Sequence, residues 1–384
     1  MKHKPVVGII GGGQLGRMFI EEALRYNLKC IVLDADKNCP ASVIAHQHIV
    51  GSIAEAGPLL QLAELCDVLT YEIEHIYIQP LLELEKQGKK LIPSPRILQM
   101  VQDKGLQKKF YSDNEIPTAP YKIVSQPSEW IDALNDLGVK KFAAKLCREG
   151  YDGKGVMLMN AGDVLNQPEN IPFNAPTVIE AFIPCKKELA VIVGCDETGH
   201  MKTFPVCEME FDEVANLVTF LFSPAQISEE KKTEAEQLAM KVVRALNGAG
   251  LFAIEMFMDE NEKLWVNEMA PRPHNSGHHT IEACYTSQYE QLLRILLQQP
   301  LGSTELLKPS AMINILGAKD FSGEYFLKGE NEILKLDGVY IHMYGKTISK
   351  PMRKLGHVTV MANTVEELKE KTKQVASLIS IQSL

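Results

Sequence analysis

The sequence predicts an α/β amino-terminal part with a parallel sheet, an α+β central part and a small mixed carboxy-terminal part. Near the amino terminus, stretches typical of strands and helices alternate. Further on, a long amphipathic helix precedes two strands, and short strand candidates follow the prolines near residue 300. Alternating strands and helices favour a parallel sheet with crossover helices. A chain of 384 residues is long enough for roughly two or three domains.

The amino-terminal part begins with a strand, a glycine turn, a helix and a second strand, which together cover Val6 to Leu33. Apolar residues recur at helical spacing in the helix and run uninterrupted in the strands. Asp67–Glu74 is a further strand that ends in polar residues. Pro93 and Pro95 then interrupt the chain, and we place the first domain boundary just after them.

The central part contains a helix at 228–247 whose two ends are marked in the sequence. Ser228 is a good N-cap residue, and Asn247-Gly248 is typical of a helix end. The other expected elements are strands at Lys141–Leu146, Val178–Phe182, Phe252–Met258 and Leu264–Ala270, strands near 312–316, 339–343 and 357–361, and a closing amphipathic helix around 365–380.

Composition excludes several classes of protein. Apolar residues make up 45% and charged residues 23% of the chain, as in globular rather than disordered proteins. The formal charge of −9 offers no basic surface for DNA or RNA. No apolar run approaches the roughly 18 residues that cross a bilayer, and Val6–Ile10 is too short for a secretory signal. None of the eight cysteines forms a C-x-x-C pair, and we expect a cytoplasmic protein without nucleic-acid or membrane partners.

The turn Gly11-Gly12-Gly13-Gln14-Leu15-Gly16 follows the first strand and opens the first helix. Backbone N–H groups at such a turn can receive an anion. Because Asp34 or Asp36 follows about 20 residues later, the turn also matches the dinucleotide fingerprint. The residues alone leave three interpretations open: a dinucleotide site, a site for another anion, or a plain turn.

Glu255 and Glu268 lie in the two strands of an expected hairpin. If residues 261 and 262 are its tip, the two glutamates face each other on one side of the sheet. Like charges in this position are destabilising, and a Mg²⁺ ion between them would remove the repulsion. In another register they are two exposed strand glutamates, and the spacing does not decide between these interpretations.

The loop Glu149-Gly150-Tyr151-Asp152-Gly153-Lys154-Gly155 is rich in glycine and polar residues. Its glycines would let the backbone approach phosphates or move as a lid, although a hairpin tip has the same composition. Lys145 lies just before the loop in an apolar strand. A lysine is costly to bury there unless it meets an anion.

A polar segment directly follows the strand that contains Glu268. Arg272 is suited to clamp a phosphate or a carboxylate-like oxyanion. His274 and His278 have the spacing of a zinc pair, but Gly277 disfavours the helix that a zinc pair requires. We therefore favour an oxyanion site over catalytic zinc.

Positive charge gathers near the carboxy terminus, although the chain as a whole is acidic. Lys346 is followed by the run Lys350-Pro351-Met352-Arg353-Lys354. Such a run is either a solvated basic loop or a site for an anion such as a phosphate.

Taken in this order, the lysine, the glycine loop and the paired carboxylates resemble the ATP-grasp superfamily. The finer motifs resemble its N5-carboxyaminoimidazole ribonucleotide synthetase family. The matching stretches cover almost the whole chain and are GGGQLGRM (11–18), TYEIEH (70–75), QDKGLQK (102–108), GYDGKG (150–155), NEMAPRPHNSGHHTIEAC (267–284), MINILG (312–317) and YGKTISKPMRKLGHVT (344–359).

The resemblance implies an ATP-grasp fold in three parts. These are an α/β pre-ATP-grasp domain at 1–101, an ATP-grasp region at 102–300 with its glycine lid within about 120–180, and a small carboxy-terminal domain at 301–384. It also implies that ATP and bicarbonate form carboxyphosphate and ADP. Carboxyphosphate then carboxylates 5-aminoimidazole ribonucleotide to N5-carboxyaminoimidazole ribonucleotide, with release of phosphate, in de novo purine (IMP) biosynthesis. A Mg²⁺ requirement and a homodimer are implied as well.

The site residues implied by the resemblance fall into four groups. The nucleotide would contact Lys104, Lys145, Gly150, Tyr151, Gly153, Lys154, Gly155, Glu180, Ala181, Phe182, Ile183, Glu188, Glu208, Asn267 and Glu268. Glu255 and Glu268 would hold Mg²⁺, so the resemblance favours the metal interpretation of the hairpin. The reacting groups would be contacted by Asp152 (a candidate proton acceptor), Arg272, His274 and Asn275. The ribonucleotide would contact Gln14, Glu74, Tyr151, and, at its 5′-phosphate, Lys346 and Arg353.

Two positions depart from the family pattern. Lys104 stands where many relatives have arginine, and Met352 interrupts a motif that often reads R-P-G-R-K. Three other functions compete: an ATP-grasp ligase that uses formate or an amino acid, an NAD-dependent oxidoreductase, and a catalytically silent nucleotide-binding regulator. The 274–278 segment and the basic cluster count against the first. The paired glutamates count against the second, and Asp152 and Arg272 count against the third.

Overall fold

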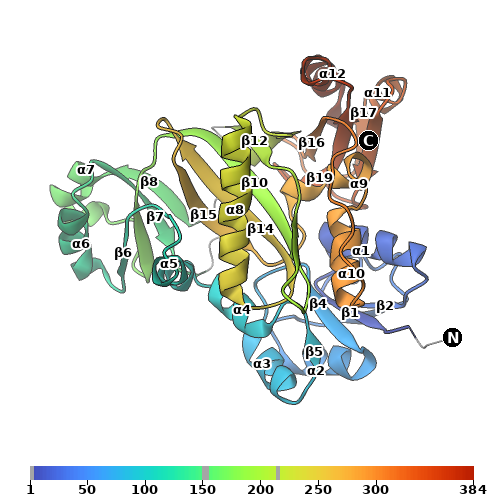
Figure 1. The fold of residues 1–384 in the computed structure, drawn as a ribbon, viewed down its shortest axis with the longest axis horizontal. Coiled ribbons are helices and arrows are strands. Elements are labelled where there is room, and N and C mark those ends of the chain that lie inside the picture. Colours follow the sequence, from blue (N-terminus) through green and yellow to red (C-terminus); the bar gives the residue numbers. More distant parts are fainter. Residues whose placement is uncertain (1–3, 149–154, 213–216) are drawn as a thin grey trace.

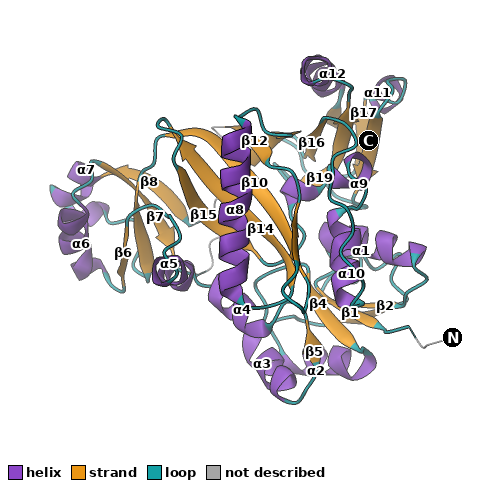
Figure 2. Cartoon of the chain, viewed as in Figure 1, coloured by secondary structure: helices purple, strands orange, loops and turns teal. Residues whose placement is uncertain are grey.

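The computed structural model describes residues 4–148, 155–212 and 217–384 and shows several sheets flanked by helices (Figures 1 and 2). The predicted combination of an α/β amino-terminal part with α+β parts is confirmed. Within these three ranges, no helix has both the length and the apolar character needed to cross a membrane.

A five-stranded parallel sheet with the order β3-β2-β1-β4-β5 forms the amino-terminal part. Its elements are β1 (Val7–Ile10), α1 (Gln14–Arg25), β2 (Cys30–Asp34), β3 (Gln47–Val50), α2 (Ala56–Leu65), β4 (Val68–Tyr71), α3 (Ile78–Lys86) and β5 (Lys90–Leu91). The carboxyl ends of β1 and β4 are neighbours, because Ile10 pairs with Tyr71. The turn that starts at Gly11 therefore lies beside Glu72.

A four-stranded antiparallel sheet with the order β6-β9-β7-β8 forms the lobe on the left in Figure 1. The elements that lead to it and build it are α4 (Pro95–Val101), α5 (Lys104–Asp113), β6 (Tyr121–Val124), a 3₁₀ turn at Pro127–Glu129, α6 (Trp130–Leu137), β7 (Lys141–Leu146), β8 (Val156–Asn160), α7 (Ala161–Leu165), a 3₁₀ turn at Pro168–Asn170 and β9 (Thr177–Ala181). Trp130 is fully buried and packs edge to face on Phe142, with 6.1 Å between the rings, which fixes α6 to the sheet.

The largest sheet has nine strands in the order β15-β14-β10-β12-β13-β16-β19-β18, with β11 paired to β10. Its strands and the helices between them are β10 (Cys185–Cys195), β11 (Met201–Thr203), β12 (Cys207–Asp212), β13 (Leu217–Ser223), α8 (Glu229–Leu246), β14 (Gly250–Asp259), β15 (Leu264–Ala270), a 3₁₀ turn at Asn275–Gly277, α9 (Thr280–Ala283), α10 (Gln288–Leu296), β16 (Ser310–Leu316), β18 (Val339–Met343) and β19 (Lys354–Met361). α8 crosses one face of this sheet and packs on β10 and β14 (Figure 1).

The carboxy-terminal part shares the nine-stranded sheet with the central part. β13 pairs with β16, so the hydrogen-bonded ladder continues across the region of residue 300. The remaining elements are β17 (Tyr325–Lys328), α11 (Glu330–Ile333), α12 (Val365–Leu378) and β20 (Ser380–Ser383), with β17 paired to β20. On the face opposite α8, α10 covers part of β10 and β14. Because the ladder continues from β15 to β18, residues of both parts can contribute to a site on the rest of this face.

Most of the expected elements are present, but the strands between residues 183 and 227, of which β10 is the longest, were missed from the sequence. The Ser228 hydroxyl caps α8 by accepting a hydrogen bond from the backbone N–H of Lys231 at 3.3 Å, and the helix ends at Asn247 in a left-handed conformation. β10 is buried on both faces from Leu189 to its end. It therefore lacks the alternation that marks a half-exposed strand.

Candidate functional site

A one-residue bulge in β15 places two consecutive polar side chains on the same face of the large sheet. Three residues, 260–262, lie between Asp259 and Lys263, whose backbone groups are hydrogen-bonded at 3.1 Å. With this tip, unbroken alternation would turn Glu268 toward the face packed by α8. The register shifts at Asn267, however, so that Glu255 lies directly opposite Glu268. The predicted pairing is confirmed, but it depends on the bulge and not on a two-residue tip.

Lys104 meets Glu268 from the first turn of α5. Asp103 caps this helix by accepting hydrogen bonds from the backbone N–H groups of Gly105 and Leu106, and the Lys104 Nζ lies 2.6 Å from Glu268 Oε2. Gln107 fixes the same helix to β15, because its Oε1 accepts a hydrogen bond from the Met269 N–H at 3.3 Å. Lys104 holds the pKa of Glu268 at about 2, so Glu268 is ionised at neutral pH.

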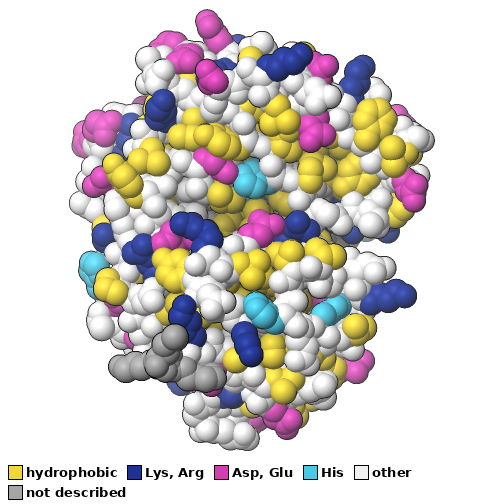
Figure 3. Space-filling view, turned by 90° about the vertical axis from the view of Figure 1, so that its right-hand side faces the viewer, with side chains coloured by type: hydrophobic (Ala, Val, Ile, Leu, Met, Phe, Trp, Pro, Cys, Tyr) yellow, Lys and Arg dark blue, Asp and Glu magenta, His cyan; other side chains and the backbone are white. Residues whose placement is uncertain are grey.

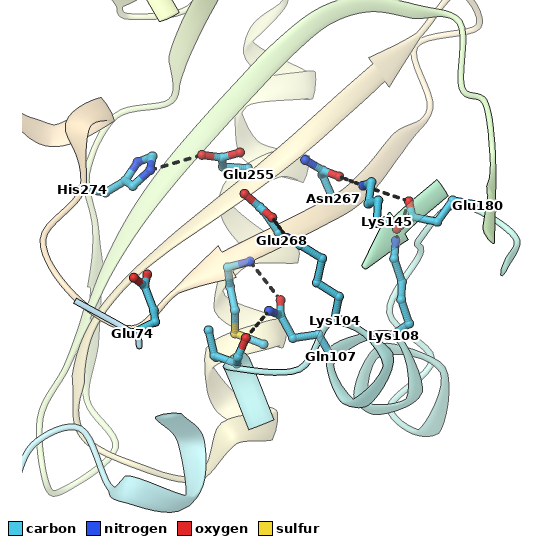
Figure 4. A network of polar contacts seen from close by, with 12 residues as sticks. Glu74, Lys104, Gln107, Lys108, Lys145, Glu180, Glu255, Asn267, Glu268 and His274 are labelled. Carbon is cyan, nitrogen blue, oxygen red and sulfur yellow. Dashed lines mark hydrogen bonds and ion pairs between the residues drawn. The ribbon is translucent and has the colours of Figure 1, made fainter. Parts of the chain in front are cut away.

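Glu255 and Glu188 lie on the same face as Glu268, but their pKa values are raised whereas that of Glu268 is lowered. Burial and the charges of Glu268 and Glu188 raise the pKa of Glu255 to about 8. Burial likewise raises the pKa of Glu188 to about 7. His274 approaches from the segment after β15, and its Nε2 lies 3.3 Å from Glu255 Oε1 (Figure 4). This crowding of carboxyl oxygens fits a hard cation such as Mg²⁺, which Glu255, Glu268 and the amide oxygen of Asn267 would hold.

A second cluster of charges lies beside the first, around the buried carboxylate of Glu180. Lys145 Nζ lies 3.1 Å from Glu180 Oε2 and 2.9 Å from Asn267 Oδ1. Lys108 Nζ lies 3.1 Å from the same Glu180 oxygen (Figure 4). Although burial opposes ionisation, Lys145 and Lys108 hold the pKa of Glu180 below its ordinary value. Sequence reasoning missed Lys108, although it stands one helical turn after Lys104 on the same face of α5.

The segment after Glu180 connects the four-stranded sheet to the nine-stranded sheet. The Ala181 N–H donates to Pro120 O at 2.8 Å, and the Phe182 N–H donates to Lys141 O at 3.1 Å. The ammonium group of Lys141 also lies 4.0 Å from the centre of the Phe182 ring. Ile183 follows directly, before β10 begins. The predicted adenine-binding segment is thus a link between two sheets, next to the cluster around Glu180.

Two further contacts join the segment after β15 to other parts of the chain. Arg272 Nη2 lies 2.7 Å from Glu74 Oε1, which connects this segment to the amino-terminal domain. The side-chain amides of Asn275 and Asn314 exchange two hydrogen bonds of 3.0 and 3.1 Å, which connect it to β16. The zinc interpretation would need His274 on a helix, but His274 instead caps the 3₁₀ turn at Asn275–Gly277. Residues from all three sequence regions therefore meet at the end of β15.

The glycine turn of the amino-terminal domain is occupied by the chain's own carboxylates. Glu72 accepts hydrogen bonds from the N–H groups of Gly13 and Gly16, at 2.5 and 2.9 Å. Asp34 accepts one from Gly12 at 2.8 Å. A Cβ atom at Gly13 would lie 2.5 Å from Glu72 Oε1, so glycine is needed for this close approach. The dinucleotide interpretation of the turn is therefore wrong, because Asp34 and Glu72 bind the amides that a phosphate would need. Gln14 begins α1 beside this turn.

Glu208 lies on the wrong face of the sheet for the predicted nucleotide contact. Its neighbour Cys207 pairs with Ala190, and Ala190 pairs with Glu255. The side chain of Cys207 therefore lies on the face of the sheet that carries the paired carboxylates. Glu208 points to the opposite face because side chains alternate along a strand. Its carboxylate there pairs with Lys187 and accepts a hydrogen bond from the Gln226 N–H at 2.9 Å. We correct the prediction and leave Glu208 out of the site.

The basic cluster lies between β18 and β19. Lys346 Nζ donates to Lys354 O at 2.8 Å, and Arg353 Nη1 donates to Ile348 O at 2.7 Å. The charge of Lys354 acts on Glu255 and slightly offsets the rise in its pKa. Of the predicted glycine-loop residues, Gly155 is described and adopts a positive φ of 72°. Gly150, Tyr151, Asp152, Gly153 and Lys154 lie outside the described residues.

Met352 adopts a left-handed backbone conformation with φ of 58°. Non-glycine residues pay about 1–2 kcal/mol for this conformation, whereas glycine adopts it freely. We expect Met352→Gly to stabilise the protein by about 0.5–1 kcal/mol, because the relief of strain exceeds the added entropy of the unfolded chain. Urea unfolding of the two proteins measures this difference. A loss of stability would show that packing of the methionine side chain outweighs the strain.

Three family models match successive parts of the chain. They describe a ribonucleotide synthetase preATP-grasp domain (residues 4–102), an ATP-grasp domain (109–289) and a phosphoribosylaminoimidazole carboxylase C-terminal domain (310–371). An N5-carboxyaminoimidazole ribonucleotide synthase of Staphylococcus aureus is 35% identical, over 96% of both chains. Phosphoribosylaminoimidazole carboxylases of Vigna aconitifolia and Schizosaccharomyces pombe match as well, but the chain spans only 66% and 67% of their length.

Solved structures agree with the sequence matches. A Thermotoga maritima N5-carboxyaminoimidazole ribonucleotide synthetase is 39% identical with a TM-score of 0.90, over 99% of this chain and all of the other. The Aspergillus clavatus synthase, solved with ADP and 5-aminoimidazole ribonucleotide, is 34% identical with a TM-score of 0.88, over 98% and 99% of the two chains. The resemblance deduced from the sequence motifs is therefore confirmed along the whole chain. This chain belongs to the N5-carboxyaminoimidazole ribonucleotide synthetase family of ATP-grasp ligases, which carboxylate 5-aminoimidazole ribonucleotide with ATP in purine biosynthesis.

Proposed function

We propose that the chain carries out the family's carboxylation in two half-reactions that share one site. In the first, a bicarbonate oxygen attacks the γ-phosphorus of ATP, the bond to ADP breaks, and carboxyphosphate forms. In the second, the exocyclic amine of 5-aminoimidazole ribonucleotide takes the carboxyl carbon and loses a proton, and phosphate leaves. The observation that carries this proposal is the meeting of the paired carboxylates, three largely buried lysines (Lys104, Lys108 and Lys145) and Arg272 near the end of β15.

The nucleotide would lie between the four-stranded sheet and the nine-stranded sheet. Lys104 and Lys145 would contact its phosphates, and the backbone of 180–183 would contact adenine. Glu188 faces the same side as Glu255, since both pair along β10 and β14, and would contact the ribose hydroxyls. When Mg²⁺ is bound by Glu255 and Glu268, it neutralises charge on the phosphates. Family structures solved with ATP and with ADP support nucleotide binding by this chain.

The acceptor side would be formed by the segment after β15. Arg272 would hold bicarbonate and the carboxyphosphate oxygens with its planar guanidinium group. His274 and Asn275 would complete this side, and Asn314 would hold the Asn275 amide in place. Glu74 approaches from the amino-terminal domain and, with Gln14, would contact the ribonucleotide. Tyr151 and Asp152, which we expect to approach its imidazole ring, lie outside the described residues.

The 5′-phosphate of the ribonucleotide would be bound by Lys346 and Arg353. We expect Arg353→Ala to raise the KM for the ribonucleotide by about tenfold or more, with little change in the KM for ATP, because a charge-assisted contact to phosphate is lost. Steady-state kinetics with each substrate varied in turn measures the two constants. An equal loss of affinity for ATP would contradict this phosphate site.

The reaction is tested by measuring ADP release with Mg²⁺ and ATP while bicarbonate and the ribonucleotide are added separately and together. The proposal expects release that requires the ribonucleotide, together with an acid-labile carboxylated product. Release with formate or an amino acid as acceptor would keep the ATP-grasp chemistry and overturn the substrate. Absence of release with every acceptor, from folded protein, would favour a silent nucleotide-binding regulator.

A homodimer, a cytoplasmic location and the domain limits 1–101, 102–300 and 301–384 complete the proposal. Figure 3 shows hydrophobic side chains on the surface of the carboxy-terminal part, above a band of charged side chains that crosses the middle of this face. Two apolar side chains of this part, Leu334 and Tyr340, are 55% and 43% exposed. Exposed apolar surface is common where protein subunits meet. Sedimentation of the purified chain tests the dimer.

A further inference from the structure

We propose that Lys108 is a positioning residue that neutralises Glu180, so that Lys145 can bind the nucleotide phosphates. This inference rests on the nucleotide site proposed above, to which it adds a residue with a defined role. Lys108 comes from α5, one turn after Lys104, and its side chain is only 3% exposed. It lines one small cavity together with Lys104, Lys145, Asn267 and Glu268.

The argument begins with the geometry of Glu180, which shares one oxygen between two lysines. Glu180 Oε2 lies 3.1 Å from Lys108 Nζ and 3.1 Å from Lys145 Nζ. All three side chains are nearly buried, with exposures of 4%, 3% and 11% for Glu180, Lys108 and Lys145. A charge buried to this degree is strongly unfavourable unless an opposite charge meets it.

The two lysines differ in what else they contact. Lys108 Nζ donates to Thr118 Oγ1 at 2.6 Å, and Thr118 Oγ1 donates in turn to Val266 O at 2.7 Å. This chain of hydrogen bonds ties the Lys108 ammonium group to the backbone of β15 at Val266. Lys145 Nζ instead contacts Asn267 Oδ1, next to Glu268, at 2.9 Å. Lys145 thus lies between Glu180 and Asn267, next to the paired carboxylates, whereas Lys108 reaches Glu180 from α5 (Figure 4).

The electrostatic consequence follows from a count of charges. If Lys145 were the only cation at Glu180, the pair would be neutral, and a phosphate beside Lys145 would be repelled by the nearby carboxylate. With Lys108 as a second cation, the group of three carries one positive charge for an anion. Burial lowers the pKa of Lys108 to about 8, which still leaves most of it protonated at pH 7. Because these three side chains are nearly buried, such a difference in charge has a large effect on anion binding.

The test is a double-mutant cycle read by calorimetric titration with ADP and Mg²⁺. Lys108→Met removes the charge but keeps much of the side-chain length, and we expect it to weaken ADP binding by about tenfold or more. Glu180→Gln introduced into Lys108→Met removes the carboxylate that Lys108 neutralises. The double variant should therefore bind ADP more tightly than Lys108→Met alone. A double variant that binds as weakly as the single variant, or more weakly, would overturn the proposal.

Two further variants separate this role from a contribution to folding alone. Lys108→Arg keeps the charge and should bind ADP within about threefold of the unmodified chain. Lys109→Met changes the adjacent lysine, which is 66% exposed and pairs with Asp113 on the surface, and should leave binding unchanged. If Lys108→Met fails to fold, weak binding by folded Lys108→Arg would still overturn the charge argument. If the unmodified chain does not bind ADP, the proposed nucleotide site is refuted. If Lys108→Met binds ADP as tightly as the unmodified chain, only this inference is refuted.

Discussion

Replacement of Glu268 by glutamine is expected to reduce ADP release by about 10³-fold or more, the largest effect of any single change considered for this chain. Glu268 is the carboxylate that stays ionised, because Lys104 holds its pKa at about 2. Glutamine keeps the shape and one oxygen but removes the charge that would hold Mg²⁺ and Lys104 at the phosphates. Steady-state ADP release at saturating Mg²⁺ and ATP measures the loss.

The matched control for this experiment lies on the same hairpin. Glu260 is an exposed glutamate at the tip between β14 and β15, and Glu260→Gln removes the same charge far from the paired carboxylates. It should leave ADP release unchanged. Near-normal turnover by folded Glu268→Gln would refute the metal assignment.

Arg272→Ala is expected to reduce kcat by about 10²–10³-fold, because the guanidinium group would stabilise the oxyanion that forms during both half-reactions. Its Nη2 lies 2.7 Å from Glu74 Oε1, and its Nη1 donates to Pro273 O at 3.0 Å, so its plane is held from two sides. Arg272→Lys should recover only part of the activity, since an ammonium group cannot make two parallel hydrogen bonds. Rates at saturating substrate distinguish this loss from a change in KM.

The control for Arg272 is an arginine outside the site. Arg96 has a side chain that is 80% exposed and pairs with Glu85, so Arg96→Ala should keep full activity. If Arg272→Ala changed only the KM for the ribonucleotide and left kcat intact, Arg272 would bind the acceptor and would not stabilise the transition state.

The elements that could be predicted from the sequence are those marked by local signals, such as helix caps and apolar periodicity. Ser228 and Asn247 mark the two ends of α8 directly, and β15 was expected over its observed range. β10 could not be recognised in this way, because its burial on both faces depends on strands that are distant in sequence. A strand of this kind is set by tertiary packing and not by its own pattern.

The candidate site likewise combines features that the local sequence indicates with features that depend on distant parts of the chain. Hairpin spacing allowed the pairing of Glu255 with Glu268 as one of two registers, and the family resemblance favoured it. The bulge that makes this pairing possible leaves no sign in the composition of the strand. The role of Glu72 in filling the glycine turn was missed, since it depends on β1 and β4 being neighbours. Lys108 was missed because a lysine on a helix is usually solvated, and only the position of Glu180 shows that this one is buried.

The bulge at Asn267 also determines how this hairpin can tolerate a change in length. Removal of Asn267 would straighten β15 and still leave Glu268 opposite Glu255, because three residues would then lie between each glutamate and the Asp259–Lys263 pair that closes the tip. The shortened hairpin would lose only the amide oxygen that Lys145 contacts at 2.9 Å. Asn267 is thus an extra residue that the strand pairing does not need, so a deletion of Asn267 would separate its proposed part in ligand binding from the pairing of the two strands.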